Sequence, residues 1–274
     1  MGPSTTIIEK KSRLKLVDWK ELADYRDLLY FLIVRGIRAK YAQSVLGVSW
    51  AVIQPLFTML VFTIVFGNLA KISSDGVPYA LFSFSALMPW TYFSGVLNEA
   101  SNSLTTNANM LSKVYFPRIV LPLAAMLGKL LDFSITLLVM GVLLVMFNYM
   151  PSYQLVFLPL LLLYLLMTAL GPSLILAAWS VQYRDIKYAM TFIVQLLMYA
   201  APVVYPLSLI PQKYQLWYAL NPLVGVIEGF RAAILGTSVM PWPIIGIGFS
   251  MSWVILMVGL YTFSRLERTF ADVA

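Results

Sequence analysis

Between Arg35 and Leu56 the chain reads RGIRAKYAQSVLGVSWAVIQPL, and within this stretch charge gives way to a long apolar run. Arg35, Arg38 and Lys40 stand at its start, whereas residues 45–70 contain no Lys, Arg, Asp or Glu. Lys and Arg that flank a membrane span favour the cytoplasmic side. The pattern therefore indicates a segment that enters a membrane from the cytoplasm.

The composition indicates a membrane protein without catalytic chemistry. The 274 residues are 60% hydrophobic and 11% charged, with a mean hydropathy of +0.81, which is more apolar than a soluble domain. Nine of the 19 Lys and Arg precede residue 41, as expected of a charge bias across a membrane rather than a nucleic-acid patch. Cys and His are absent, so disulfides, the commonest metal ligand and the commonest general base are missing. We expect no catalytic site, no metal and no nucleic-acid partner.

Hydropathy predicts an all-α membrane protein with six transmembrane helices, over residues 45–69, 78–98, 119–147, 155–181, 188–205 and 244–264. An amphipathic interface helix, capped by Asp18 and ending near Ala42, is expected before them; the alternative is a solvated helix that packs on a soluble partner. Residues 1–44 would be a tail and interface helix, 45–264 a transmembrane domain and 265–274 a cytoplasmic tail. With both termini cytoplasmic, fifteen Lys and Arg fall inside and three fall in the outer half.

Residues 207–240 are apolar but interrupted by Pro211, Pro222 and several glycines, so no uninterrupted span fits them. Broken backbone survives at membrane depth only when it is buried in protein or lines water. We therefore expect a re-entrant helical hairpin at the outer face. Glu228 and Arg231, three residues apart, are expected to form a salt bridge that fixes this hairpin. The alternative is a gate or a head-group contact.

The stretch from Glu99 to Arg118 is the first sizeable polar loop. Ser101 or Asn102 is expected to cap a short helix there. Apolar residues recur in it at helical spacing, which favours a helix that docks on a partner: Leu104, Ala108, Leu111 and Tyr115.

Lys129 and Asp132 lie three residues apart within the third span, so they share a helix face and can pair. Each would cost about 2.5–3.5 kcal/mol if it faced lipid, so both should face the bundle interior or an aqueous path. Two interpretations stay open: a polar patch in a translocation path, or a structural pair that ties the span to a neighbour. The Gly128-Lys129 dipeptide lacks the rest of a phosphate-binding loop, so this chain is not expected to bind ATP.

Several motifs together resemble one family, and they extend from Tyr25 to Arg268. They are the series Arg35, Arg38, Tyr41, Leu46, Gly47, Trp50, Gln54 and Pro55; NMLSKVYFPRIVLP at 109–122; Tyr183-Arg184-Asp185 with Gln195 and PVVYP at 202–206; and Asn221-Pro222-Leu223 with Glu228-Gly229-Phe230-Arg231. In combination they resemble the polysaccharide-exporting permeases of the type 2 class of ABC exporters.

This resemblance implies one half of a homodimeric channel, paired with two copies of a separate ATPase that binds ATP and Mg²⁺. The implied substrate is a lipid-linked polysaccharide, such as O-antigen on an isoprenoid pyrophosphate, exported across the cytoplasmic (inner) membrane. Teichoic acid, capsule and a small hydrophobic compound are alternative substrates for the same class. Rivals from other classes are a membrane-embedded glycan enzyme and a gradient-driven flippase of lipid-linked glycans. The flippase would require inverted repeats, and none is found.

The resemblance also implies roles for particular residues. Coupling to the ATPase is expected of Asn102, Ala108, Leu111, Lys113, Tyr115, Arg184 and Asp185. An outer gate is expected to include Asn221, Pro222, Glu228 and Arg231. Beside these, we hypothesise that the basic helix attracts a pyrophosphate head group through Arg35, Arg38 and Lys40.

Overall fold

The computed structural model describes residues 19–42, 46–183, 185–236 and 239–267, and every regular element in these ranges is a helix. Five helical stretches in the described ranges are long and apolar enough to span a membrane: Gly47–Leu69, Tyr79–Thr106 (α4), Val120–Met146 (α6), Tyr153–Gln182 and Trp242–Leu266 (α11). The first combines η1 (Gly47–Ser49), α3 (Trp50–Phe62) and the π-helix η2 (Thr63–Leu69), and the fourth combines η3 (Tyr153–Phe157) with α7 (Leu158–Gln182). The chain is an all-α membrane protein, as its hydropathy predicts.

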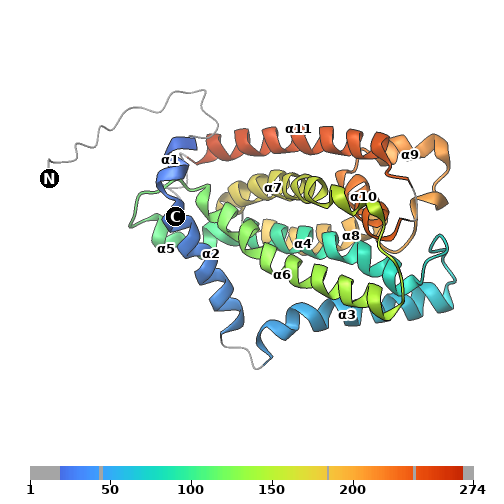
Figure 1. The fold of residues 1–274 in the computed structure, drawn as a ribbon. Helices are drawn as coiled ribbons and strands as arrows, with labels where there is room; N and C mark the ends of the chain where they lie inside the picture. Colours follow the sequence, from blue (N-terminus) through green and yellow to red (C-terminus); the bar gives the residue numbers. More distant parts are fainter. Residues whose placement is uncertain (1–18, 43–45, 184, 237–238, 268–274) are drawn as a thin grey trace.

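The long helices run side by side between two ends of an elongated bundle (Figure 1). One end carries α1 (Trp19–Asp24), α2 (Arg26–Tyr41), α5 (Ala108–Leu111) and the last turn of α11. The opposite end carries α9 (Gln212–Tyr218). We call these the α2 end and the α9 end.

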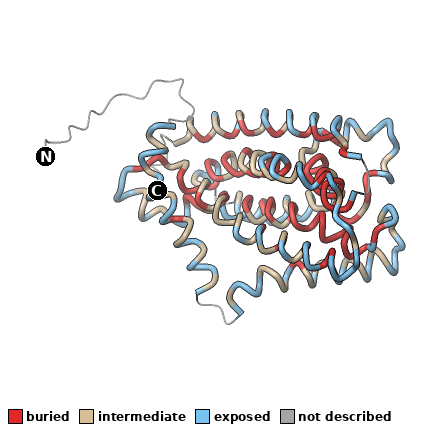
Figure 2. The backbone as a smooth tube through the Cα atoms, viewed as in Figure 1, coloured by how far each residue is buried: buried red, intermediate tan, exposed pale blue. Residues whose placement is uncertain are grey.

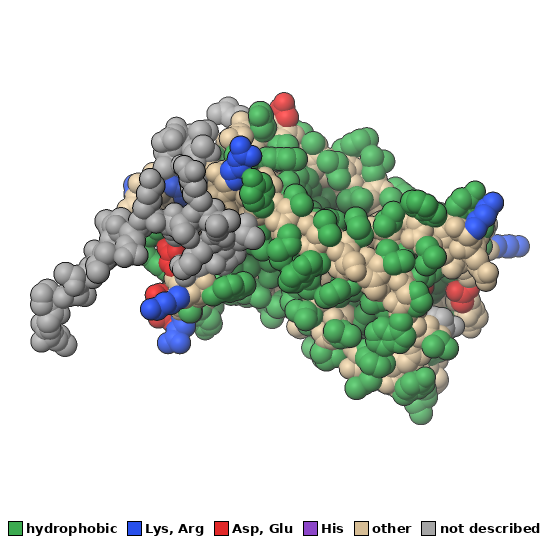
Figure 3. Space-filling model, turned by 90° about the horizontal axis from the view of Figure 1, so that it is seen from above, with side chains coloured by type: hydrophobic (Ala, Val, Ile, Leu, Met, Phe, Trp, Pro, Cys, Tyr) green, Lys and Arg blue, Asp and Glu red, His purple; other side chains and the backbone are tan. Residues whose placement is uncertain are grey.

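Helix α4 forms the centre of the bundle, and it packs against α3, α6, α7, α8 and α10. Its apolar window is 83% buried, whereas that of the first span, which contains α3, is only 6% buried. Figure 2 shows this contrast between the centre and the α3 edge. In the face shown in Figure 3, hydrophobic side chains cover the middle and charged side chains gather toward the two ends. This distribution suits a bundle whose middle lies in hydrocarbon.

Close contact between α7 and α11 depends on two glycines. A Cβ atom at Gly259 would lie 2.4 Å from the carbonyl oxygen of Gly171, a distance that two heavy atoms cannot adopt without a shift. Small residues allow helix backbones to approach in this way, and membrane helices use them for packing because hydrocarbon supplies no hydrophobic driving force between helices.

The helices differ from the sequence-based expectation in several places. The interface helix is interrupted at Tyr25, between α1 and α2, and its expected cap Asp18 lies outside the described residues. The helix that carries the second span does not end at Asn98, where the span was expected to end, because α4 continues without a break to Thr106. A separate helix capped by Ser101 or Asn102 was therefore a wrong expectation, and only the short α5 follows α4.

The fifth predicted span is helical only as α8 (Ile186–Ala200), which has 15 residues. At 1.5 Å per residue it is about 22 Å long, shorter than the roughly 30 Å hydrocarbon core. The non-helical segment Ala201–Pro206 continues it. After the short η4 (Leu207–Leu209), helices α9 and α10 (Pro222–Leu235) meet at a bend of 112°. The predicted pair of short helices before the last span is therefore present.

Candidate functional site

Four charged side chains and one tyrosine form a network that joins α2, α4 and α6. The carboxylate of Asp132 accepts hydrogen bonds from the Lys40 ammonium and the Tyr41 hydroxyl. Lys129 Nζ lies 3.5 Å from Asp132 Oδ2 and also pairs with Glu99. Two positive and two negative charges therefore meet at one place, and we call these five residues the charge network.

The charge network ties the interface helix to the transmembrane bundle. Burial, with the hydrogen bond to Asp132, raises the pKa of Tyr41, which keeps this hydroxyl protonated as a donor. A cavity of about 450 Å³ lies beside the network, between α2, α4 and α6, and Asn98 and Asn102 contribute to its lining. Ion pairs to two neighbouring helices favour the structural interpretation of Lys129 and Asp132. A role for them in a translocation path stays a prediction.

The three cations at the end of α2 have different surroundings. Lys40 is engaged by Asp132. Arg35 and Arg38 are exposed, and they line a hollow of about 480 Å³ together with Phe31 and Val34. Positive charge next to an apolar surface is the arrangement that an anionic amphiphile requires. Of the three residues proposed from the sequence for head-group attraction, Arg35 and Arg38 thus retain exposed guanidinium groups.

The segment after α4 lies against the interface helix at the α2 end. The Tyr115 hydroxyl donates to Glu21 Oε1 at 3.1 Å, and the Tyr25 hydroxyl donates to the Tyr115 carbonyl at 3.3 Å. Ala108 and Leu111 are half-buried on α5, whereas Lys113 is exposed. Lys113 and Tyr115 thus give this segment an exposed patch, which Tyr115 anchors to Glu21 of α1 and to Tyr25, the residue before α2.

The turn before α8 lies at the same end. Asp185 is exposed and directly precedes α8, while Arg184 lies outside the described residues. The end of α7 is fixed to α4, because the Ser180 hydroxyl donates to the Ser101 carbonyl at 2.7 Å. Asn102 lies on α4, where its amide donates to the Asn98 carbonyl at 2.7 Å.

Helix α10 has clear signals at both termini. The Asn221 side chain accepts a hydrogen bond from the Leu223 amide, Pro222 occupies the first turn, and Gly236 adopts the left-handed conformation (φ 63°) that ends the helix. The Asn221 amide also donates to the Ala200 carbonyl at 3.0 Å, which joins the start of α10 to the end of α8.

Arg231 is fully enclosed, with 1% of its surface exposed. Its Nη1 lies 2.7 Å from Glu228 Oε1, so the predicted salt bridge is present. Nη1 and Nη2 also donate to the carbonyls of Tyr205 and Val203, at 3.3 and 2.9 Å. The guanidinium carbon lies 3.7 Å from the ring centroid of Phe82. Arg231 thus fixes α10 to α4 and to the segment after α8, while its role as a gate stays a prediction.

Sequence reasoning missed Glu99 and Tyr41 as members of the charge network. Glu99 is the only carboxylate between Asp75 and Asp132, so Lys129 had few possible acidic partners. Pairing each cation near a span with the nearest acids in the sequence would have raised Glu99 as a candidate. Tyr41 gave no comparable signal, because Tyr is common at membrane interfaces.

The chain is similar to known transport proteins over most of its length. The sequence model described as ABC-2 type transporter matches residues 27–235. The O-antigen export system permease protein RfbA of Myxococcus xanthus is 33% identical over 215 residues, covering 78% of this chain and 82% of the relative. An RfbA protein of Klebsiella pneumoniae is 26% identical over 248 residues, covering 90% and 95%. The polysialic acid transport protein KpsM of Escherichia coli is 24% identical over 209 residues, covering 74% and 80%.

Proposed function

Because the chain belongs to the ABC-2 type transporter family, we propose that it is the transmembrane subunit of an ATP-driven exporter of lipid-linked polysaccharide. The observation that carries this proposal is the match with O-antigen export permeases and a polysialic acid transport protein over most of both chains. The cargo proposed is an O-antigen on an isoprenoid pyrophosphate. Capsule, teichoic acid and small hydrophobic compounds remain the competing cargoes for the same architecture.

A separate ATPase supplies the energy in this proposal. The sequence has no complete phosphate-binding loop. The patch of α5, Lys113 and Tyr115 at the α2 end, with Asp185 nearby, is the proposed docking surface for the ATPase. This end faces the cytoplasm, in line with the excess of Lys and Arg assigned to that side. The α9 end then faces outward.

Two copies of the chain form the proposed channel. The support is the first span, whose apolar window is almost wholly unburied in the single chain. A second copy placed on this side would put two such spans around a path for the polymer. Two ATPase subunits would complete the symmetric assembly.

Co-purification tests the ATPase proposal. The tagged chain is extracted gently from its native membrane, and accompanying proteins are identified. We expect a stoichiometric ATPase, whose binding and ATP turnover fall in Lys113→Glu because this change reverses charge on the docking surface. Lys213→Glu, an exposed cation on α9 at the opposite end, is the matched control. A chain that purifies alone, or one equally affected by both variants, would contradict the proposal.

Head-group attraction has its own test. The double variant Arg35→Glu, Arg38→Glu reverses both exposed cations without touching the charge network, so folding should persist. We expect loss of export with normal membrane levels and normal ATPase binding. Unchanged export at normal protein levels would remove these two residues from the mechanism.

A further inference from the structure

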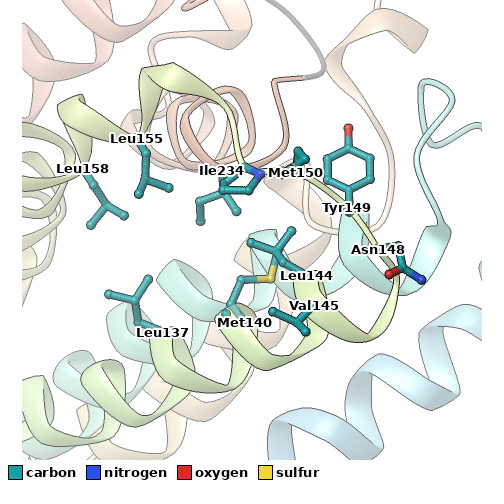
Figure 4. Close-up of a pocket in the computed structure, with 12 residues that line it drawn as sticks. Leu137, Met140, Leu144, Val145, Asn148, Tyr149, Met150, Leu155, Leu158 and Ile234 are labelled. Carbon is teal, nitrogen blue, oxygen red and sulfur yellow. The ribbon is translucent and has the colours of Figure 1, made fainter.

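An apolar groove of about 540 Å³ lies near the α9 end, where α6, η3, α7 and α10 meet (Figure 4). Met140, Leu144 and Ile234 are buried and form its floor. Leu137, Leu155 and Leu158 line it from α6, η3 and α7. Its volume is in the range of about 300–1,000 Å³ that is typical of sites for small ligands.

The groove belongs to the membrane-spanning part of the bundle and continues its lipid-facing surface. Leu138, Val142 and Val145, on the last turns of α6, are 59–77% exposed beside it. Exposed apolar side chains on a spanning helix face lipid chains wherever no second protein chain covers them. A groove that opens from this surface is therefore bordered by hydrocarbon rather than by water.

The rim of the groove is fixed to the end of α10. The Tyr149 hydroxyl donates to the Leu235 carbonyl at 2.8 Å, and the Ser152 amide donates to the Ile234 carbonyl at 3.2 Å. Asn148 and Tyr149 thus place polar groups at the end of the groove where α6 stops. Amide and phenol groups at this position match the head-group level of a bilayer.

The lining residues, all within the described ranges, include no Lys, Arg, Asp or Glu. The groove therefore offers no counter-charge for a phosphate or pyrophosphate, and its chemistry suits a hydrocarbon chain. We propose that it binds one acyl chain of a membrane phospholipid, with the head group outside the groove near Asn148. In the orientation proposed above, this phospholipid belongs to the outer leaflet. The site itself does not depend on that orientation.

A bound chain would contact Ile234 in the last turn of α10. It would fill the groove next to the Tyr149–Leu235 hydrogen bond and thereby stabilise the end of α10. The phospholipid would thus support the segment that carries Glu228 and Arg231 without touching either side chain.

Gly141 allows the groove to be filled without disturbing the protein. It lines the groove, and a Cβ atom there would meet no atom within 4 Å. Gly141→Leu therefore projects into the space assigned to the lipid chain, and leucine favours a helix more than glycine does. Gly246→Leu is the matched control, because Gly246 lies on α11, is exposed, and also has nothing within 4 Å of a Cβ atom.

The test counts bound lipid. Wild type and both variants are purified in mild detergent, titrated with phosphatidylcholine and examined by native mass spectrometry. We expect the dissociation constant of the most tightly bound phosphatidylcholine to rise at least about tenfold in Gly141→Leu. In Gly246→Leu this constant should equal that of the wild type. A phosphatidylcholine with a photoreactive acyl chain should crosslink to residues 137–158 in wild type and Gly246→Leu, and much less in Gly141→Leu.

Equal binding and equal crosslinking in all three proteins would overturn the proposal. Polyprenyl phosphate added in equal amount is the competing occupant. If it displaces the crosslinked phosphatidylcholine, the site belongs to an isoprenyl chain and the phospholipid assignment is wrong; if phosphatidylcholine stays, the assignment stands. If Gly141→Leu fails to fold, Leu155→Trp, at an exposed groove residue on η3, replaces it with the same expected losses.

Discussion

Replacement of Asp132 by Asn should weaken the attachment of α2 to the bundle. Asp132 accepts hydrogen bonds from Lys40 and Tyr41 and lies 3.5 Å from Lys129 Nζ. An asparagine keeps the size of the side chain and can still accept a hydrogen bond from Tyr41. It removes the charge that holds the Lys40 ammonium, whereas Lys129 keeps Glu99 as a partner.

The size of this effect follows from the exposure of the pair. The side chains of Lys40 and Asp132 are 42% and 23% exposed, so solvent partly screens their attraction. Fully exposed pairs contribute up to about 1 kcal/mol, and breaking a fully buried pair costs about 3–5 kcal/mol. We expect a coupling energy between Lys40 and Asp132 of about 1–2 kcal/mol, between those limits.

A double-mutant cycle measures this coupling. The free energy of unfolding is determined in mixed micelles for wild type, Lys40→Met, Asp132→Asn and the double variant, and amide exchange reports the protection of α2. The control is Asp27→Asn, since the Asp27 side chain is 96% exposed and should contribute almost nothing. A coupling energy below about 0.5 kcal/mol, within the error of additivity, would refute the attachment.

Two further changes test the packing of the bundle. Glu228→Leu should lower the free energy of unfolding by about 3–5 kcal/mol because it leaves buried Arg231 without its counter-charge, and Glu228→Gln should cost less because its amide oxygen can still accept from Arg231. Equal losses, measured by denaturant titration, would show that the neutral acceptor of Gln contributes nothing, and negligible losses in both variants would show that the charge of Glu228 is unimportant. Gly259→Ala should cost about 1–3 kcal/mol, because its methyl group would overlap the carbonyl of Gly171, while Gly246→Ala has open space and should be neutral or stabilising, because alanine favours a helix more than glycine does. Similar midpoints for the two alanine variants in a thermal unfolding assay would contradict the close contact between α7 and α11.

Most of the bundle could be predicted from the sequence because each charged residue placed in hydrocarbon carries a large cost of its own. Spans can therefore be recognised as stretches without charge, with no knowledge of how the helices pack. The fourth span was expected at residues 155–181, and η3 with α7 covers Tyr153–Gln182. The break before the last span was also readable, since Pro211 and Pro222 exclude one continuous helix. The structure places a 112° bend between α9 and α10 there.

Hydropathy did not predict where α4 ends. Asn98, Glu99 and Asn102 mark where the chain becomes polar, and the second span was therefore ended at Asn98. Hydropathy reports the cost of membrane burial and not the continuity of a helix, which polar residues can sustain outside the hydrocarbon. In α4 the amides of Asn98 and Asn102 donate to carbonyls one turn earlier, and the helix continues to Thr106.

The charge network depends on contacts between distant parts of the chain. The spacing of Lys129 and Asp132 predicted their pairing, because neighbours on one helix are fixed by its geometry. The contact of Asp132 with Lys40 depends instead on how α2 lies against α6. The packing of α2 against α6 cannot be deduced from a single sequence. Lys40 was therefore expected to act with Arg35 and Arg38.

Transport in inside-out membrane vesicles is the decisive measurement for an ATP-driven polysaccharide permease. Vesicles that contain this chain, its ATPase and lipid-linked polysaccharide are supplied with ATP, and polymer protected from added glycosidase is quantified. We predict protection that requires ATP hydrolysis, fails with a non-hydrolysable ATP analogue and persists when ionophores collapse ion gradients. Protection that persists without ATP hydrolysis and disappears with ionophores would contradict the proposal and identify a gradient-driven flippase.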